Sequence, residues 1–214
     1  MAYTWSFSNG IIVPKTSGTG IKVDTEAPTF GWRDLEGTIE FREIGVGTPA
    51  LATFRGNIRG PSFTTGDDYD LMYHLPHDYA PGSDLYIHVH WAHNGTSISG
   101  SLVLNYYITY AKGHAQAIFP AEVNLTQTIS TPDVATIPQY SHRLDEIQLS
   151  AASPSASQLD TDNIEPDGII WAHFDATTIP TIGGGVPRPF IRHIDIHYQS
   201  TSVGTKQKAP NFYV

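Results

Sequence analysis

The clearest alternation of apolar and polar positions in this chain lies at residues 84–91. The segment reads Asp-Leu-Tyr-Ile-His-Val-His-Trp, so that apolar residues occupy every second position and share one face. The opposite face carries Tyr86, His88 and His90. Side chains alternate between the two faces of a β-strand, so this pattern predicts a strand with one face in a core and a polar face elsewhere.

A second stretch with this alternation lies near the C-terminal end, at residues 190–199. Its two faces are Arg192, Ile194, Ile196 and Tyr198 on one side, and Ile191, His193, Asp195 and His197 on the other. We predict that this stretch is also a strand. Two strands of the protein would then carry histidines on one face.

Shorter strand candidates fill much of the rest of the chain, separated by clusters of turn-forming residues. They lie at residues 38–43, 50–59, 70–75, 101–110, 121–130, 141–150 and 168–175. We predict that residues 101–110 form a hairpin with residues 84–91, with a loop longer than the tight Asn-Gly type. With this spacing, no long helical pattern and no repeat, the chain is predicted to be all-β and to fold as a jelly-roll-like β-sandwich.

Residues 1–37 have a different pattern, in which Gly and Pro interrupt short apolar pieces. We predict an extended N-terminal arm here, followed at residues 38–214 by the sandwich body with its C-terminal tail. Apolar and aromatic residues are unusual in a disordered segment, so both the arm and the tail are expected to dock on a surface. The residues predicted to make these interactions are Trp5, Phe7, Ile11, Ile12, Phe30, Trp32, Phe212 and Tyr213.

The length of 214 residues suits one sandwich domain with a long arm. Disulfides are excluded because the chain has no cysteine, which is compatible with folding in a reducing cytoplasm. No segment has the pattern of a signal peptide or approaches the about 18 apolar residues of a membrane span. We therefore expect no membrane partner, and a mature protein that is the whole chain.

The charge balance is acidic, with 12 Lys and Arg against 21 Asp and Glu and a formal net charge of −9. A nucleic-acid-binding groove needs the opposite sign, so no nucleic acid partner is predicted. Charged residues make up only 15% of the chain, compared with about 25% in average soluble proteins. This composition suits a β-rich protein that covers part of its surface with neighbouring subunits.

The two histidine-bearing strands leave two interpretations open. Neutral imidazoles and a carboxylate suit Zn²⁺, Fe²⁺ or Mn²⁺, and cupin-type jelly rolls use ligands of this kind. The candidate metal ligands are His88, His90, His193, Asp195 and His197. The flanking pattern of a known metal motif is missing, however, so the favoured interpretation is a polar wall that is solvated or faces a sister subunit. On that interpretation the protein has no metal and no cofactor.

Two further patterns contain residue types that can carry chemistry. Asp160, Asp162, Glu165 and Asp167 crowd one loop, but their spacing does not match an EF-hand, so a solvated acidic turn is predicted. Ser, His and Asp are all abundant, but no Gly-x-Ser-x-Gly elbow singles out a nucleophile. The chain is therefore predicted not to be an enzyme.

Several longer segments resemble a family of tailed-bacteriophage virion proteins. They are residues 74–79 (His-Leu-Pro-His-Asp-Tyr), 84–91, 109–114 (Thr-Tyr-Ala-Lys-Gly-His), 160–168 (Asp-Thr-Asp-Asn-Ile-Glu-Pro-Asp-Gly), 195–200 (Asp-Ile-His-Tyr-Gln-Ser) and the tail at 204–213. The resemblance covers most of the chain from about Phe30. In particular, the chain is similar to capsid cement, or decoration, proteins, which sit as trimers on the outer face of the phage head.

This resemblance implies a homotrimer without catalytic residues, in which a jelly-roll body and an extended arm together clamp adjacent capsomers. The implied partner is the major capsid protein. The implied location is the outer capsid surface of the virion, after synthesis in the cytoplasm of a bacterial host. Two alternatives stay open: a phage tail or host-adhesion protein with a carbohydrate-binding β-sandwich, and a cupin-like metal-binding protein.

Overall fold

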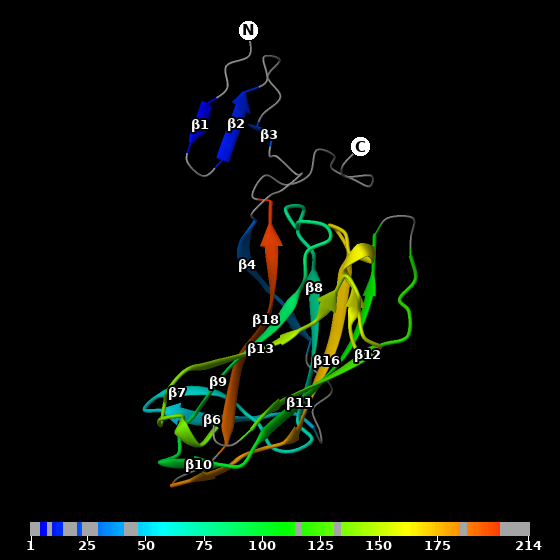
Figure 1. Ribbon diagram of the computed structural model, residues 1–214. Coiled ribbons are helices and arrows are strands. Elements are labelled where there is room, and N and C mark those ends of the chain that lie inside the picture. The colour runs from blue at the N-terminus through cyan, green and yellow to red at the C-terminus, as the bar shows by residue number, and fades with distance from the viewer. Residues whose placement is uncertain are drawn as a thin grey trace.

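The computed structural model describes residues 5–7, 10–14, 21–22, 30–40, 47–113, 117–130, 134–184 and 188–201. Most of this part of the chain lies in two antiparallel β-sheets that pack face to face (Figure 1). Helical structure in the described ranges is limited to two short 3₁₀ turns, η2 (Val134–Thr136) and η3 (Thr161–Asn163). No helix among these residues is long and apolar enough to cross a membrane.

One sheet has five strands in the order β12-β11-β16-β8-β5, and the other has four in the order β13-β9-β18-β4. The strands of the first are β5 (Thr38–Glu40), β8 (Asp68–His74), β11 (Leu102–Ala111), β12 (Val123–Ile129) and β16 (Ile169–Thr178). Those of the second are β4 (Gly31–Glu36), β9 (Tyr86–His93), β13 (Arg143–Gln148) and β18 (Pro189–Ser200).

The strand pairs are nested along the chain. β4 pairs with β18, β8 with β16, β9 with β13, and β11 with β12, and every pair is antiparallel. The chain thus forms a long antiparallel ribbon, whose closed end lies between β11 and β12. This ribbon folds over so that its strands lie in two sheets. This is the arrangement of a jelly roll, so the prediction of an all-β jelly-roll sandwich is confirmed.

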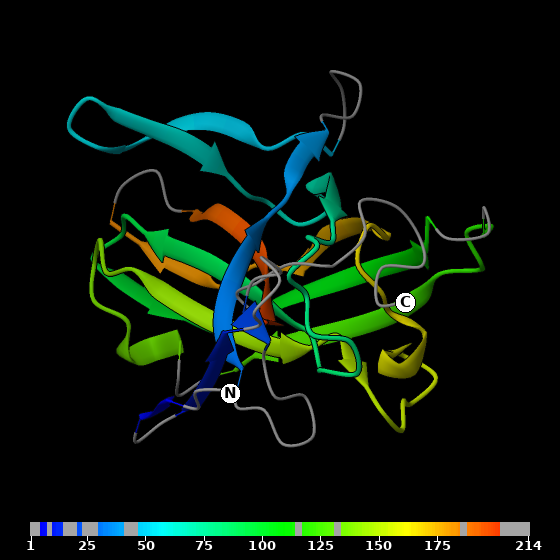
Figure 2. The ribbon, with the colours of Figure 1, turned by 90° about the horizontal axis from the view of Figure 1, so that it is seen from above.

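Smaller sheets lie around this sandwich. β6 (Ala50–Arg55) and β7 (Ile58–Ser62) form a hairpin that projects beyond the two layers (Figure 2). β10 (Ser97–Ser99) pairs with β17 (Thr181–Gly183), and β14 (Ser150–Ala151) pairs with β15 (Leu159–Asp160). β1 (Trp5–Phe7), β2 (Gly10–Pro14) and β3 (Ile21–Lys22) form a three-stranded sheet of their own.

Two parts of the predicted strand map differ from the structure. Residues 50–59 were predicted as one strand, but the chain reverses at Gly56, which has a φ of +58°, and so makes the β6–β7 hairpin. This left-handed conformation favours glycine, because glycine has no Cβ. In addition, β4 lies within the predicted N-terminal arm, but it pairs with β18 and is an edge strand of the sandwich.

The predicted strand at residues 84–91 is confirmed as β9, but its predicted hairpin with residues 101–110 is wrong. β9 and β11 lie in different sheets, because the chain crosses from one layer to the other through β10 and a turn at Gly100. Both strands have a largely apolar buried face because they face the same core from opposite sides. Alternation predicts which face of a strand is buried, but it carries no information on which strand lies beside it.

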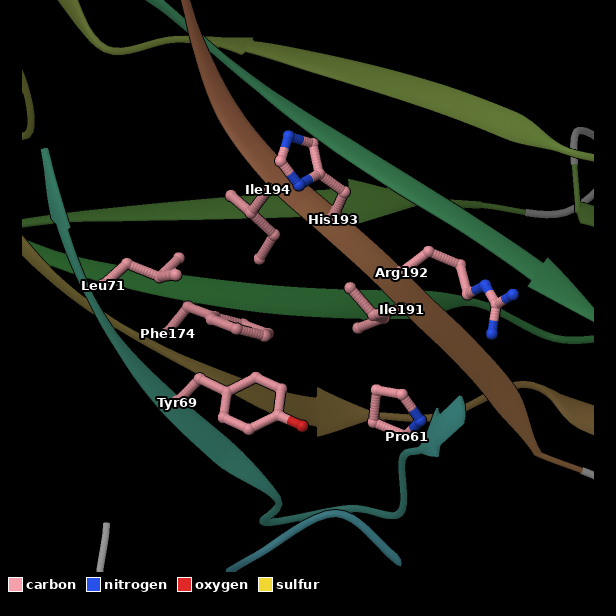
Figure 3. Close-up of a pocket in the computed structure, with 8 residues that line it drawn as sticks. All are labelled: Pro61, Tyr69, Leu71, Phe174, Ile191, Arg192, His193 and Ile194. Carbon is pink, nitrogen blue, oxygen red and sulfur yellow. The ribbon is translucent and has the colours of Figure 1, made fainter. Parts of the chain in front are cut away.

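The predicted alternation of β18 breaks at Arg192. Ile191 and His193 pair with consecutive residues of β9, so Arg192 is an extra residue in the ladder, which makes a β-bulge. Figure 3 shows the consequence: Ile191 and Ile194 point toward the side chains of the opposite sheet, whereas His193 extends to the other side of β18. The prediction that Ile191 shares a face with His193, and Arg192 with Ile194, is therefore wrong.

Tyr106 lies in the centre of the core and is only 1% exposed. Its hydroxyl donates a hydrogen bond of 2.7 Å to Oε1 of Gln127, which is also buried. Burial raises the pKa of Tyr106 well above its ordinary value, so this hydroxyl stays protonated and remains a donor.

Replacing Tyr106 with phenylalanine is expected to lower the free energy of unfolding by about 1–2 kcal/mol, because Gln127 loses its buried donor. Urea denaturation of the parent and Tyr106→Phe would measure this change. Tyr107 is a matched control, since it is half-buried on the other face of β11, and Tyr107→Phe is expected to change stability by less than about 0.5 kcal/mol. Equal stability of Tyr106→Phe and the parent would contradict the assigned role of this hydrogen bond.

Candidate functional site

Histidine and carboxylate side chains gather on the outer face of the four-stranded sheet. The central strand β9 supplies His88 and His90, and its neighbour β18 supplies His193, Asp195 and His197. In the antiparallel register, Asp195 lies opposite His88 and His193 lies opposite His90. Directly opposite residues on one face of a sheet are within contact distance. The structure therefore brings all five candidate ligands together.

Three further residues complete this group, which we call the histidine face. Glu146 of β13 lies opposite His88, Asp34 of β4 lies opposite His197, and His142 precedes β13. These three residues were missed in the sequence. No local pattern marks them, because β13 and β4 come beside β9 and β18 only through the nested pairing of the whole chain.

The histidines of this face have specific partners. Nε2 of His88 is 2.8 Å from Oε2 of Glu146, and Nδ1 of His90 is 2.9 Å from Nε2 of His142. The rings of His90 and His142 are stacked, with centroids 5.1 Å apart and an angle of 8° between their planes. The other nitrogen of His90, Nε2, lies 3.1 Å from Oδ1 of Asp195. His90 therefore lies between a second imidazole and a carboxylate.

Asp195 is the most deeply buried carboxylate of the histidine face, with 2% of the residue exposed. Its Oδ1 accepts no hydrogen bond, although Nε2 of His90 is close to it. Burial raises the pKa of Asp195, an effect that His90 and His193 oppose. Burial also lowers the pKa of His90, and the neighbouring histidines add to this effect while Asp195 opposes it. Both shifts disfavour the charged forms, so burial outweighs the mutual attraction of the pair.

A hollow of about 380 Å³ opens beside His90 and His142. It lies where the β6–β7 hairpin approaches the bulge of β18, and Phe54, Ala92, Tyr140, Arg192 and His193 form the rest of its lining. The guanidinium of Arg192 lies 5.2 Å from the centre of the Phe54 ring. The bulge thus turns a cationic side chain onto the hairpin and leaves an opening from solvent to one end of the histidine face.

The outer face of the five-stranded sheet has a different character. Trp171 of β16 lies opposite Met72 of β8, and the ring of Phe119 meets the Trp171 ring edge-on at 6.4 Å. Ile118, Phe119, Trp171 and Met72 are 85%, 45%, 46% and 36% exposed. We call these four residues the apolar patch. A water-facing sheet surface is normally polar, so this patch is a candidate contact surface.

The predicted interaction residues have varied positions. Trp5 and Phe7 lie in β1 and Ile11 and Ile12 in β2, whereas Phe212 and Tyr213 fall outside the described residues. Phe30 is half-buried just before β4.

Trp32 is an exposed residue of β4, and its ring packs against Tyr86 at 5.5 Å and His197 at 4.9 Å. Trp32 therefore flanks the histidine face.

Carboxylates of the acidic loop at residues 160–167 hold its turns. Asp160 caps η3 by accepting hydrogen bonds from the Asp162 backbone and the Asn163 side chain. Asp167 has a φ of +66°, and its Oδ1 is 2.7 Å from Nε2 of His74. Asp160 thus caps a turn within the loop, and Asp167 connects the loop to the end of β8.

Comparison with known proteins gives only distant likenesses. No family model and no curated protein matches this chain. Similar solved structures include a family 11 carbohydrate-binding module from Clostridium thermocellum in complex with a β-1,3-1,4-mixed-linked tetrasaccharide, and a chain of infectious bursal disease virus Gt strain.

The first has 14% identity and a TM-score of 0.29, with 83% of this chain and 94% of that chain covered. The second has 9% identity and a TM-score of 0.27, with 91% of this chain and 41% of that chain covered. Likenesses at this level do not bear on what the present chain binds.

Proposed function

We propose that this chain is a structural protein of a tailed-phage particle, a capsid cement protein that binds the outer surface of the head as a homotrimer and clamps adjacent capsomers. A β-sandwich of this type is compatible with a structural or binding role. The resemblance of its sequence segments to phage virion proteins supports the more specific proposal. Its partners would be two further copies of itself and the major capsid protein.

The observation that carries this proposal is the apolar patch on the five-stranded sheet. Met72 and Trp171 lie side by side on neighbouring strands, the ring of Phe119 packs edge-on against Trp171, and Ile118, which precedes Phe119 in the chain, is 85% exposed. Aromatic side chains of this kind supply much of the binding energy in protein interfaces. Burial against a partner would remove from water a surface that a lone sandwich leaves exposed.

Two other features support the same function. The three strands β1–β3 pair with each other and with no described strand of the sandwich, as expected of an arm that works apart from the body. The net charge of −9 suits a position on the outside of the head, away from packaged DNA. Three copies related by a threefold axis would form a closed ring of heterologous contacts.

Binding to phage heads that lack this protein is the direct test. Replacement of Trp171 and Ile118 by alanine is expected to weaken binding at least about 30-fold, because loss of one aromatic hot spot costs about 2 kcal/mol. Sedimentation of labelled protein with heads would measure the bound fraction.

Leu144→Ala is the matched control for this test. Leu144 is 44% exposed on the outer face of the other sheet, so its loss is expected to leave head binding unchanged. Full binding by the Trp171 and Ile118 double variant would contradict the proposal that the apolar patch is the contact surface.

A second candidate function is carbohydrate binding in a phage tail or host-adhesion protein. The observation in its favour is the exposed ring of Trp171 on a sheet face, with Phe119 beside it, because aromatic rings bury the apolar faces of sugars. Binding to a glycan array that Trp171→Ala abolishes, together with no binding to heads, would favour this function over the capsid role.

A further inference from the structure

The histidine face contains a group of side chains that could share one cation. A ring nitrogen of His88, a ring nitrogen of His90 and a carboxylate oxygen of Asp195 all lie within 4.8 Å of one another. Two imidazoles with one carboxylate form a ligand set that suits Zn²⁺, Fe²⁺ or Mn²⁺. We propose that His88, His90 and Asp195 bind a divalent transition-metal ion on the outer face of the four-stranded sheet.

The spacing of the ligand atoms supports this site. Nitrogen and oxygen ligands bind such ions at about 2.0–2.2 Å, so neighbouring ligands on one ion are about 3–3.5 Å apart. Nε2 of His90 and Oδ1 of Asp195 already have this separation, at 3.1 Å, and they do not hydrogen-bond to each other. Two groups that are close but unbonded are placed as ligands of a shared ion would be.

The buried carboxylate gives a second, independent reason. Asp195 is 2% exposed, and its Oδ1 accepts no hydrogen bond from any described residue. Buried polar atoms in proteins nearly always have a partner, and an exception calls for an explanation. A cation held by this oxygen would supply the missing partner and would balance the negative charge.

The neighbours of the two histidines have the form of outer-shell partners. Glu146 contacts Nε2 of His88, and His142 contacts Nδ1 of His90. Metal-binding histidines typically use their second nitrogen in this way, which fixes the orientation of the ring. The ring of His90 is thereby held at Nδ1, while its Nε2 faces Oδ1 of Asp195, where an ion would bind.

A second triad, made by Asp34, His88 and His197, shares one residue with the first. It is more open to solvent, since the Asp34 side chain is 65% exposed and lies 3.8 Å from His197. Because both triads include His88, they are not two independent sites. The deeper group with Asp195 is the site that we propose, because solvent competes least there.

The test uses the full chain, expressed without a histidine tag and dialysed against metal-free buffer. Titration with Zn²⁺, followed by calorimetry, is expected to show one ion bound per chain and a rise in the thermal unfolding midpoint. Replacing Zn²⁺ with Co²⁺ provides visible absorption bands that report directly on the ligands. Asp195→Asn and His90→Ala are each expected to abolish the Co²⁺ spectrum and the rise in midpoint.

His173→Ala is the matched control. Nδ1 of His173 lies 3.0 Å from Oδ1 of Asp70 on the outer face of the other sheet, and both side chains are half-buried. This pair belongs to none of the metal-binding groups among the described residues, so its loss is expected to leave Co²⁺ binding unchanged.

One more variant keeps the proposal testable if substitution of a metal ligand unfolds the chain. Glu146→Gln alters only the partner of His88, and the Glu146 side chain is 49% exposed, so the change is not expected to unfold the chain. It is expected to weaken metal binding about 10- to 100-fold. The proposal is overturned if the parent binds no stoichiometric ion, or if Asp195→Asn and Glu146→Gln both keep the Co²⁺ spectrum and affinity of the parent.

Discussion

Replacement of Trp91 by alanine is expected to lower the free energy of unfolding by about 3–5 kcal/mol, the range found for large aromatic residues removed from a core. Trp91 is completely buried in β9, two residues before the strand ends at His93. Its Nε1 donates a hydrogen bond of 2.8 Å to Oδ2 of Asp145, which also accepts hydrogen bonds from Arg143. The substitution would leave a cavity and take one donor from a half-buried carboxylate.

A loss of this size is comparable to the whole stability of many domains, which is about 5–15 kcal/mol. Urea denaturation followed by tryptophan fluorescence and circular dichroism would measure it. Trp32→Ala removes the same side chain from an exposed position on β4, where 44% of the residue is accessible, and is expected to cost less than about 1 kcal/mol. Similar losses for the two variants would show that Trp91 does not anchor the core.

Deletion of residues 1–30 is expected to abolish the decoration of phage heads while leaving the sandwich folded. The deletion removes β1–β3, which supply no strand to either layer, and stops before β4. The proposed clamp would therefore lose its arm and keep its body. Electron microscopy of heads mixed with the truncated protein would measure decoration, and circular dichroism would verify the fold.

A longer deletion distinguishes the contribution of the arm from that of the edge strand β4. Removal of residues 1–37 also takes away β4 and leaves one side of β18 without its paired strand. This variant is expected to be less stable than the shorter one, because backbone groups of β18 lose their ladder partners. Full decoration of heads by the chain that lacks residues 1–30 would falsify the clamp.

Much of the fold could be predicted from the sequence because alternation is a local property. The buried faces of β9 and β11 follow directly from apolar residues at every second position, and both strands were located within one or two residues at their ends. The pairing of strands depends on contacts between distant parts of the chain. The hairpin predicted between these two strands failed for this reason, since each has a regular apolar face but belongs to a different sheet.

The candidate site shows the same division between local and distant information. His88 and His90 were recognised because they lie two positions apart on one strand, and the same spacing marked Asp195 and His197. Glu146 escaped notice because its strand reaches β9 only through the nested fold. The bulge at Arg192 was also missed, since an extra residue in a ladder is visible only when the opposite strand is known.

The nesting of the strands also determines where the chain enters and leaves the sandwich. Gly31 at the start of β4 and Ser200 at the end of β18 are directly opposite each other in the register. A domain whose first and last strands begin and end side by side can be inserted into a surface loop of another protein without stretching that loop. The sandwich from residue 31 to residue 200 is thus suited to serve as a self-contained insert, with both connections at one corner.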